Sequence, residues 1–430
     1  MKNSFILKGH ICHTPEKGTM EIREHAFAVC EDGICRGVFD KMPDKFRGLE
    51  VIDCGDRLVI PGMADLHIHA PQFTYRGTGM DCELLQWLTE NAFPEEARYA
   101  DTGYAVRAYS IFADKMRRSA TTRAVIFGTI HTDADLILAD LMEKSGIVSY
   151  VGKVNMDRKS PAALTEKTAR HSAEETVRFI EETEKRGYRR TGPIITPRFV
   201  PSCTRKLMGM LGKIREEYDL PVQSHLSENQ TEIRLVSRLE PDAAFYGDAY
   251  DRFGLFGRGA KTVMAHCVWS PPEEVKRIRD NGVWIAHCPS SNMNIRSGLA
   301  PVRRYLEAGI HVGLGTDVAG GTCESMFRAV TDAIQVSKMY WRLVDSKAKA
   351  LTFPEAFRMA TKGGGSFFGQ VGSFEDGYEF DAVVLDDSSE KTARPLTTAE
   401  RLERAFYLEL DRTGIVRKFV RGEEVETGPF

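Results

Sequence analysis

The stretch Asp65-Leu66-His67-Ile68-His69 ends an apolar run that begins near residue 59, and it is the strongest local signal in the sequence. Because strand side chains alternate between faces, His67 and His69 point to the same side of a predicted strand. Burying two such imidazoles in an apolar core is unfavourable, since each ring carries two polar nitrogens that need partners. The motif alone leaves two interpretations open: a structural histidine pair, or part of a metal site.

From residue 59 onward, short apolar runs alternate with longer charged stretches, which is typical of βαβ units and a parallel sheet. The predicted strands are 59–69, 123–130, 147–154, 193–199, 221–226, 262–268, 283–288 and 311–316. Stretches between them predict helices, for example 164–186, 204–217, 271–281 and 323–341. Eight strands over roughly 300 residues predict an α/β fold of the (β/α)8 TIM-barrel type. A doubly wound open sheet is the alternative, but neither a Gly-rich dinucleotide fingerprint nor a GxxxxGK[ST] loop occurs in the sequence.

Short apolar runs also lie before and after the predicted barrel. They are 6–7, 26–29 and 51–52 on one side, and 382–385, 414–416 and 419–420 on the other. We predict that the two flanking segments pair into one small β domain. The expected organisation is therefore a β domain of residues 1–60 plus 371–430, beside a barrel of residues 61–370.

Composition and charge narrow the function classes. The 430 residues include 58 Lys and Arg against 61 Asp and Glu, with a formal charge of -3 and a pI near 6.4, which argues against a broad nucleic-acid-binding surface. A hydrophobic content of 42% and a mean hydropathy of -0.30 are typical of a globular protein. No apolar run approaches the roughly eighteen residues of a membrane span. The nine cysteines are scattered, and residues 1–8 carry too short an apolar run for a secretory signal, so we expect reduced thiols and a cytoplasmic location.

Three more candidate metal ligands each end a different predicted strand. His225 ends the fifth strand, His266 the sixth and Asp317 the eighth. Because the carboxyl ends of barrel strands meet at one mouth, we expect these side chains to lie beside His67 and His69. Imidazoles with a carboxylate suit zinc, and iron(II) or another transition ion is the alternative.

Glu228 follows His225 by three residues, so we expect it just past the strand end, curling back over the mouth. A carboxylate near a metal-activated water, but not ligating the metal, is placed for proton transfer. The alternative is a solvated glutamate that opens the next helix. Beside His225 we favour the proton-transfer interpretation.

Several longer stretches carry a resemblance to a known family. They are 61–72, 85–88 with 93–94, 151–154, 196–199, 223–229, 286–292 and 313–321. Together with the histidine and aspartate pattern, they resemble the amidohydrolase superfamily and, within it, the guanine deaminase family. The resemblance covers most of residues 60–385.

The resemblance implies a metal-dependent hydrolase that converts guanine to xanthine and ammonia through a metal-activated water. It implies one zinc ion per chain, with iron as the alternative, held by His67, His69, His225 and Asp317. Asp317 would also accept the proton that the water loses. The resemblance further implies a homodimer, and we expect no nucleic-acid or membrane partner.

The same resemblance assigns the substrate side of the site. Glu228 would be the proton shuttle, and His266 would hold the reacting water or the tetrahedral centre; both would also face the substrate. Gln72, Arg198 and Phe199 would recognise the purine. Their chemistry agrees: Arg198 only donates, which suits a carbonyl and rejects an amine, Phe199 offers a flat face, and Gln72 can both donate and accept.

Two other functions remain open at this point. One is a sister enzyme acting on another aminated or halogenated heterocycle, such as an adenosine derivative, a pterin or a triazine. The other is a non-catalytic barrel that binds rather than reacts, which predicts missing ligands. Lys153 ends the third predicted strand rather than the fourth, so we favour one metal over a two-metal site bridged by a carbamylated lysine. For His131 and His287 we expect structural or supporting roles rather than ligation.

Overall fold

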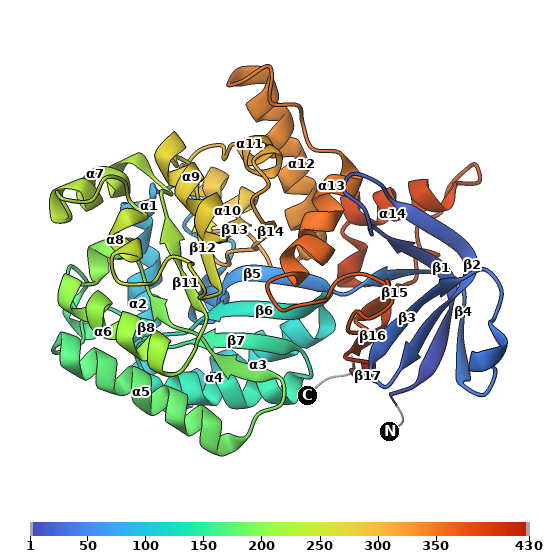
Figure 1. The fold of residues 1–430 in the computed structure, drawn as a ribbon, viewed down its shortest axis with the longest axis horizontal. Helices are drawn as coiled ribbons and strands as arrows, with labels where there is room; N and C mark the ends of the chain where they lie inside the picture. The colour runs from blue at the N-terminus through green and yellow to red at the C-terminus, as the bar shows by residue number, and fades with distance from the viewer. Residues whose placement is uncertain (1–2, 427–430) are drawn as a thin grey trace.

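A computed structural model describes residues 3–426, and its largest feature is a parallel barrel (Figure 1). The barrel strands are β5 (Met63–His69), β6 (Thr121–Phe127), β7 (Val148–Gly152), β9 (Thr191–Pro193), β11 (Val222–Leu226), β12 (Thr262–His266), β13 (Trp284–His287) and β14 (Val312–Leu314). They run in the order β11-β12-β13-β14-β5-β6-β7-β9 with parallel pairing throughout. A parallel bridge between Ile195 and Val222 joins the two ends. The predicted barrel fold is confirmed.

Helices surround the barrel (Figure 1). The longer ones are α3 (Thr102–Arg118), α4 (Thr132–Ser145), α5 (Ala169–Arg186), α6 (Arg205–Glu217), α7 (Gln230–Leu239), α9 (Pro272–Asn281), α12 (Met326–Leu343) and α14 (Thr398–Tyr407). Shorter ones are α1 (Leu84–Trp87), α2 (Phe93–Glu96), α8 (Asp248–Asp251), α10 (Pro289–Asn294), α11 (Val302–Glu307) and α13 (Phe353–Arg358). The helix predicted over 164–186 begins at Ala169, because the Thr168 side chain caps it by accepting from the N–H of His171.

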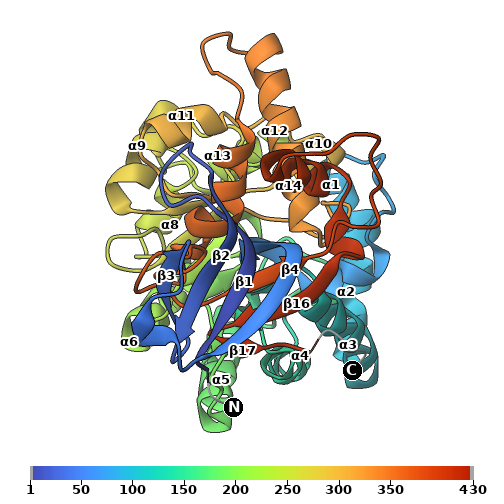
Figure 2. The same ribbon diagram turned by 90° about the vertical axis from the view of Figure 1, so that its right-hand side faces the viewer.

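A second sheet joins the two ends of the chain (Figure 2). Its strands are β1 (Phe5–His13), β2 (Glu21–Glu31), β3 (Ile34–Phe39), β4 (Glu50–Pro61), β15 (Ala382–Leu385), β16 (Ile415–Val420) and β17 (Glu423–Glu424), in the order β17-β16-β15-β4-β1-β2-β3. β4 pairs antiparallel with β15, so the N-terminal and C-terminal segments form one small β structure, as the fold prediction states.

The strand predicted over 59–69 is wrong in one respect, because it is two strands. Val59 and Ile60 belong to β4 of the small sheet, whereas Met63 opens the barrel strand β5. Gly62 separates them at a point where a Cβ would lie 2.3 Å from the side chain of Thr122. The apolar run is continuous in sequence because both strands are buried there.

Other strand boundaries also differ from the prediction. The fourth barrel strand is β9 at 191–193, not 193–199, and Thr196–Pro197 forms β10, which pairs with β8 (Val154–Asn155) in a separate two-stranded sheet. A proline has no N–H to donate, so Pro193 and Pro197 interrupt a continuous ladder. Residues 415–416 and 419–420 of the two predicted runs fall in the single strand β16. β1, β2 and β4 are longer than the apolar runs predicted in them, and β3 was not predicted.

Buried charges join the small sheet to the barrel. Arg123 of β6 donates from Nε and Nη2 to the Asp381 carboxylate at 2.6 and 2.7 Å, and both side chains are almost fully buried. Lys418 of β16 donates to the carbonyl of Ser119, beyond the end of α3, at 3.1 Å. Within residues 3–426, none of the helices combines the length and apolar character needed to cross a membrane.

Candidate functional site

The candidate metal ligands converge at the C-terminal mouth of the barrel. His69 Nε2 lies 3.2 Å from His225 Nε2 and 3.5 Å from Asp317 Oδ1, and His67 Nε2 lies 3.2 Å from Asp317 Oδ1. The two histidines of the sequence motif end β5, His225 lies near the end of β11, and Asp317 follows β14. All four side chains are buried. The structure therefore brings together the four predicted ligands.

Neighbouring groups fix how these rings face the mouth. His225 Nδ1 lies 2.6 Å from the carbonyl oxygen of Arg198, so Nδ1–H donates there and the Nε2 lone pair points at the other ligands. Buried Asp65 accepts from the N–H and the hydroxyl of Thr316 at 3.0 and 2.5 Å, which ties β5 to the chain just past β14. The sequence gives no sign of this link, because residues 65 and 316 are far apart along the chain.

The donor set fits a transition metal ion. Burial lowers the pKa of His67, His69 and His225 well below the usual range, so the imidazoles are neutral and keep a lone pair for a metal. Among the described residues, His67 Nε2 has no hydrogen-bond partner. Donor atoms at 2.0–2.1 Å from a tetrahedral ion stand about 3.3 Å apart. The separations of 3.2 and 3.5 Å agree with that spacing.

Glu228 lies next to this cluster. A left-handed backbone at Ser227, with φ of 45°, turns the chain just past β11 and brings Glu228 over the mouth. Its Oε2 lies 3.4 Å from His266 Nε2, and its Oε1 accepts from Ser297 Oγ at 3.1 Å. Burial, and then the Asp317 carboxylate, raise the pKa of Glu228 to about 8. A carboxyl group with a pKa in this range can take up and release a proton near neutral pH.

The position of Glu228 does not match that of a solvated helix-opening residue. α7 begins after Asn229, whose side chain caps it together with Glu232, whereas Glu228 precedes the cap and is 2% exposed. On the other side, His266 Nδ1 lies 2.9 Å from Asn292 Oδ1 and donates to it. His266 therefore presents its Nε2 lone pair to the mouth.

A pocket opens beside the ligand cluster. Gln72, Arg198 and Phe199 line it, together with Glu228 and the histidines. Leu84 and Trp87 of α1, Leu88 and Ile295 add apolar walls. Trp87 and Leu88 belong to a stretch that carries the family resemblance, but sequence reasoning gave them no role. Apolar walls with a few polar groups suit a flat heterocycle.

Behind the polar side of this pocket lies a buried residue that the sequence did not indicate. Glu96 ends α2 and is 1% exposed. Its carboxylate accepts from Arg198 Nη1 and Nη2 at 2.5 and 3.0 Å, and from Gln72 Nε2 at 2.8 Å. Gln72 Oε1 in turn accepts from the N–H of Ala319 at 3.1 Å. The only sequence signal was that a buried arginine needs a carboxylate partner.

Three further residues considered from the sequence lie outside the two ligand groups found in residues 3–426. Lys153 is buried and pairs with Glu166. His131 precedes α4 at its N-cap position. His287 ends β13, and burial lowers its pKa to about 3. These positions agree with structural roles.

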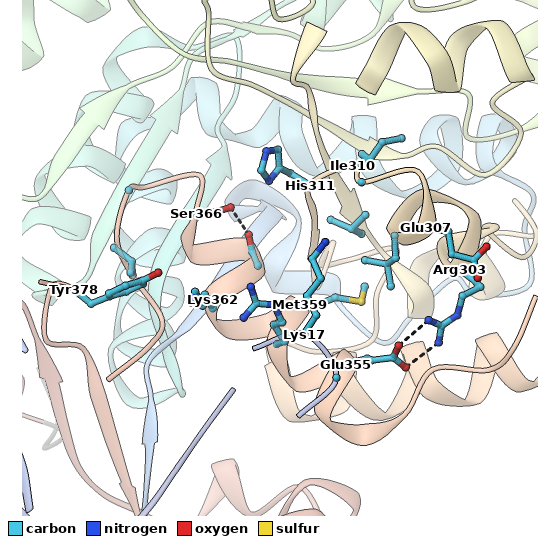
Figure 3. Close-up of a pocket in the computed structure, with 18 residues that line it drawn as sticks. Lys17, Arg303, Glu307, Ile310, His311, Glu355, Met359, Lys362, Ser366 and Tyr378 are labelled. Atoms are coloured by element: carbon cyan, nitrogen blue, oxygen red, sulfur yellow. Dashed lines mark hydrogen bonds and ion pairs between the residues drawn. The ribbon is translucent and has the colours of Figure 1, made fainter. Parts of the chain in front are cut away.

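A larger cavity of about 410 Å³ lies at the opposite end of the barrel (Figure 3). It is lined by His311 and Val312 at the start of β14, and by charged side chains of which several are already paired. Arg303 pairs with Glu355 at 2.7 Å, and Arg358 Nη1 donates to the carbonyl of Thr14 at 2.7 Å. These contacts link segments of the chain to one another, so we place the candidate catalytic site at the C-terminal mouth of the barrel and not in this cavity.

Comparisons with known proteins agree with this geometry. The amidohydrolase family matches residues 58–425. The chain is 39% identical over 399 residues to guanine deaminase of Mus musculus, covering 89% of this chain and 86% of that protein. It is 36% identical over 360 residues to guanine deaminase of Escherichia coli, covering 83% and 77%. The solved structure of guanine deaminase from C. acetobutylicum with bound guanine superposes with a TM-score of 0.94 at 45% identity, covering 98% of this chain and 100% of that one.

Proposed function

The chain belongs to the amidohydrolase family, and we propose that it hydrolyses guanine to xanthine and ammonia. The observation that carries this proposal is the likeness, over 98% of the chain, to a guanine deaminase solved with guanine in its active site. The pocket supports it, because Gln72 and Arg198 lie in the same pocket as Glu228 and the candidate metal ligands.

We propose His67, His69, His225 and Asp317 as the ligands of one zinc ion per chain, with iron as the alternative. Zinc, when bound, lowers the pKa of water towards neutrality and so supplies a hydroxide nucleophile. The mixed imidazole and carboxylate donors, neutral and buried, support this choice.

The proton transfers are then the work of the chain's own side chains. Asp317 accepts the proton that the attacking water loses. Glu228 delivers a proton to the ring nitrogen next to C2 as that carbon is attacked. The proton that Asp317 took from the water then passes to the C2 amine, which leaves as ammonia, and the proton left on the attacking oxygen returns to Glu228. His266 Nε2, 3.4 Å from Glu228, holds the reacting oxygen. The raised pKa of Glu228 supports its role, since a carboxyl group that is partly protonated near neutral pH can act in both directions.

Recognition of the base falls to Gln72, Arg198 and Phe199. The Arg198 guanidinium donates to the C6 carbonyl of guanine, and it would leave an amine at C6 unpaired. Phe199 lies with its ring 6.5 Å from that of His225 and offers the purine a flat face beside the ligand cluster.

We further propose a homodimer in the cytoplasm. The C-terminal end of α12 projects from the body of the molecule (Figure 1), and Met339, Trp341, Leu343 and Val344 there are 43–69% exposed, an apolar surface of the kind that subunit contacts cover. All nine cysteines are free, as in a reducing compartment. We also propose the division into residues 1–60 plus 371–430 and residues 61–370.

The alternatives make different predictions. A non-catalytic barrel would lack ligands or the shuttle, and every one of these residues stands at the mouth of this barrel. A sister enzyme for adenosine derivatives, pterins or triazines would need other groups where Gln72, Arg198 and Phe199 stand. Neither is favoured by an observation in this structure.

The test is ammonia release from a panel of heterocycles by the metal-loaded protein. We expect guanine to react, and adenine and cytosine to react at least about a thousandfold more slowly, because a site built on hydrogen bonds to a carbonyl rejects an amine. Faster turnover of adenine or of a triazine would refute the proposal.

A further inference from the structure

Glu96 stands behind the two polar side chains that we propose to recognise guanine. It touches neither the candidate metal ligands nor Glu228 through any hydrogen bond or ion pair found between residues 3 and 426. Its carboxylate instead accepts three hydrogen bonds, two from Arg198 and one from Gln72. A buried carboxylate with this set of partners acts on the pocket through those two side chains.

The first consequence concerns the orientation of the Gln72 amide. An amide can present either its oxygen or its NH2 group, and the network around it decides which. Here Oε1 faces the N–H of Ala319 and Nε2 faces Glu96, so turning the amide over would set donor against donor and oxygen against oxygen. Glu96 therefore helps to fix the orientation of the Gln72 amide, and the second N–H of Nε2 is left to donate to a ligand.

The second consequence concerns Arg198. The two terminal nitrogens of the guanidinium bind Glu96 in a bidentate pair, which fixes its plane, and each keeps a further N–H for a ligand. The Phe93 ring lies 5.1 Å from the guanidinium and adds a second contact that holds it. Because Glu96 balances the charge of Arg198, this wall of the pocket offers donors without a net positive charge. Such a wall suits an uncharged ligand that carries acceptors.

We propose that Glu96 is a positioning residue that sets substrate specificity, by fixing the Gln72 amide in one orientation and holding the Arg198 guanidinium in place as a donor. The pocket then selects heterocycles that present a carbonyl and ring nitrogens along one edge, and it rejects those with an amine or nothing in place of the carbonyl. This inference rests on the proposed function, since it assumes that Gln72 and Arg198 face the base.

If Glu96 had only a structural role, its replacement would have a different effect on the substrates. If Glu96 only neutralised Arg198 and held α2 in place, its loss would lower stability and reduce turnover of all substrates alike. If it positions two donors, its loss must change the preference between ligands that differ only in the acceptor. The ratio of two substrates separates these cases, because a general loss of folded enzyme cancels in it.

The variant is Glu96→Gln, which keeps the shape but offers only one acceptor oxygen and places an NH2 group against a donor. Its matched control is Glu95→Gln, the same change at the neighbouring residue, which bonds to Tyr104 and not to the pocket. The substrates are guanine and 2-aminopurine, which keeps the amine at C2 but lacks the carbonyl. We expect kcat/KM for guanine to fall roughly 10- to 100-fold, mainly through KM, with the guanine preference over 2-aminopurine reduced about tenfold. Metal content should not change.

Two further measurements keep the proposal testable if the Glu96→Gln variant folds poorly. Glu96→Asp keeps the charge but is one carbon shorter, so it cannot reach both partners, and we expect the preference to fall in the same direction. Combining Glu96→Gln with Arg198→Ala should cost less than the sum of the single changes, because both act on the same contact. If both Glu96 variants keep the wild-type preference, or if the two substitutions are additive, Glu96 does not position these donors. If wild type does not deaminate guanine at all, it is the proposed function that fails.

Discussion

Replacing Glu228 with glutamine removes proton transfer by this side chain while keeping its hydrogen bonds to neighbouring residues. The glutamine oxygen can still accept from Ser297 Oγ, which lies 3.1 Å from Glu228 Oε1. Its NH2 group can donate to His266 Nε2, because Nδ1 of that ring is already the donor to Asn292. Since burial already raises the pKa of Glu228 to about 8, a neutral amide adds no new desolvation cost.

The expected loss therefore lies in catalysis rather than folding. A positioned acid and base contributes roughly 10²- to 10⁴-fold to a rate. That range corresponds to about 2.7–5.4 kcal/mol in the activation free energy. We expect kcat of Glu228→Gln with guanine to fall by this factor, with KM changed only a few-fold. Metal content should stay at the wild-type level, since Glu228 is not among the four ligands.

The assay is the ultraviolet absorbance change on conversion of guanine to xanthine, with metal analysis of the same samples. Glu274→Gln is the matched control: Glu274 is also fully buried, but it accepts from Ser227 Oγ at 2.6 Å and does not face the pocket. Turnover of Glu228→Gln within a few-fold of wild type would refute the shuttle. Loss of metal would show instead that Glu228 supports the ligand cluster.

Three further outcomes follow from the structure. Elemental analysis should find close to one transition ion per chain, and a chelator should abolish turnover until metal is restored. Two ions per chain, or full activity without any metal ion, would contradict the single site. Asp317→Ala should lose turnover and metal affinity together, as measured by activity and metal content, and retention of both would remove Asp317 from the site. Asp381→Ala should lower stability by about 3–5 kcal/mol, because it leaves the buried Arg123 charge without its closest partner. For a chain of this size that corresponds to a fall of about 3–6 °C in Tm, measured by calorimetry. The control Asp376→Ala removes an exposed carboxylate and should change Tm little. Equal shifts in Tm for the two variants would contradict the role of the buried pair.

Much of the site was predictable because it depends on local order. Strand side chains alternate, and the carboxyl ends of barrel strands meet at one mouth. These two rules bring His67, His69 and Asp317 together once the strands are identified. The position of Glu228 follows in the same way from its spacing after His225, although the turn at Ser227 that aims it is visible only in the structure.

The rest was not predictable because it depends on contacts between distant segments. Glu96 acts through Gln72 and Arg198, which lie on two other segments of the chain, and no residue near Glu96 in the sequence indicates this role. The break at Gly62 was hidden for a different reason. Strands buried on both faces read as one apolar run, so their boundary leaves no change in hydropathy.

The most direct test of hydrolytic deamination is to run the reaction on guanine in water enriched in ¹⁸O and to measure the mass of the product by mass spectrometry. Hydrolysis at C2 replaces the amine with an oxygen taken from water. Hydrolysis by this route gives xanthine that carries one labelled oxygen, together with one ammonia per turnover. Xanthine without the label, or no xanthine from the metal-loaded protein while another heterocycle reacts, would contradict it.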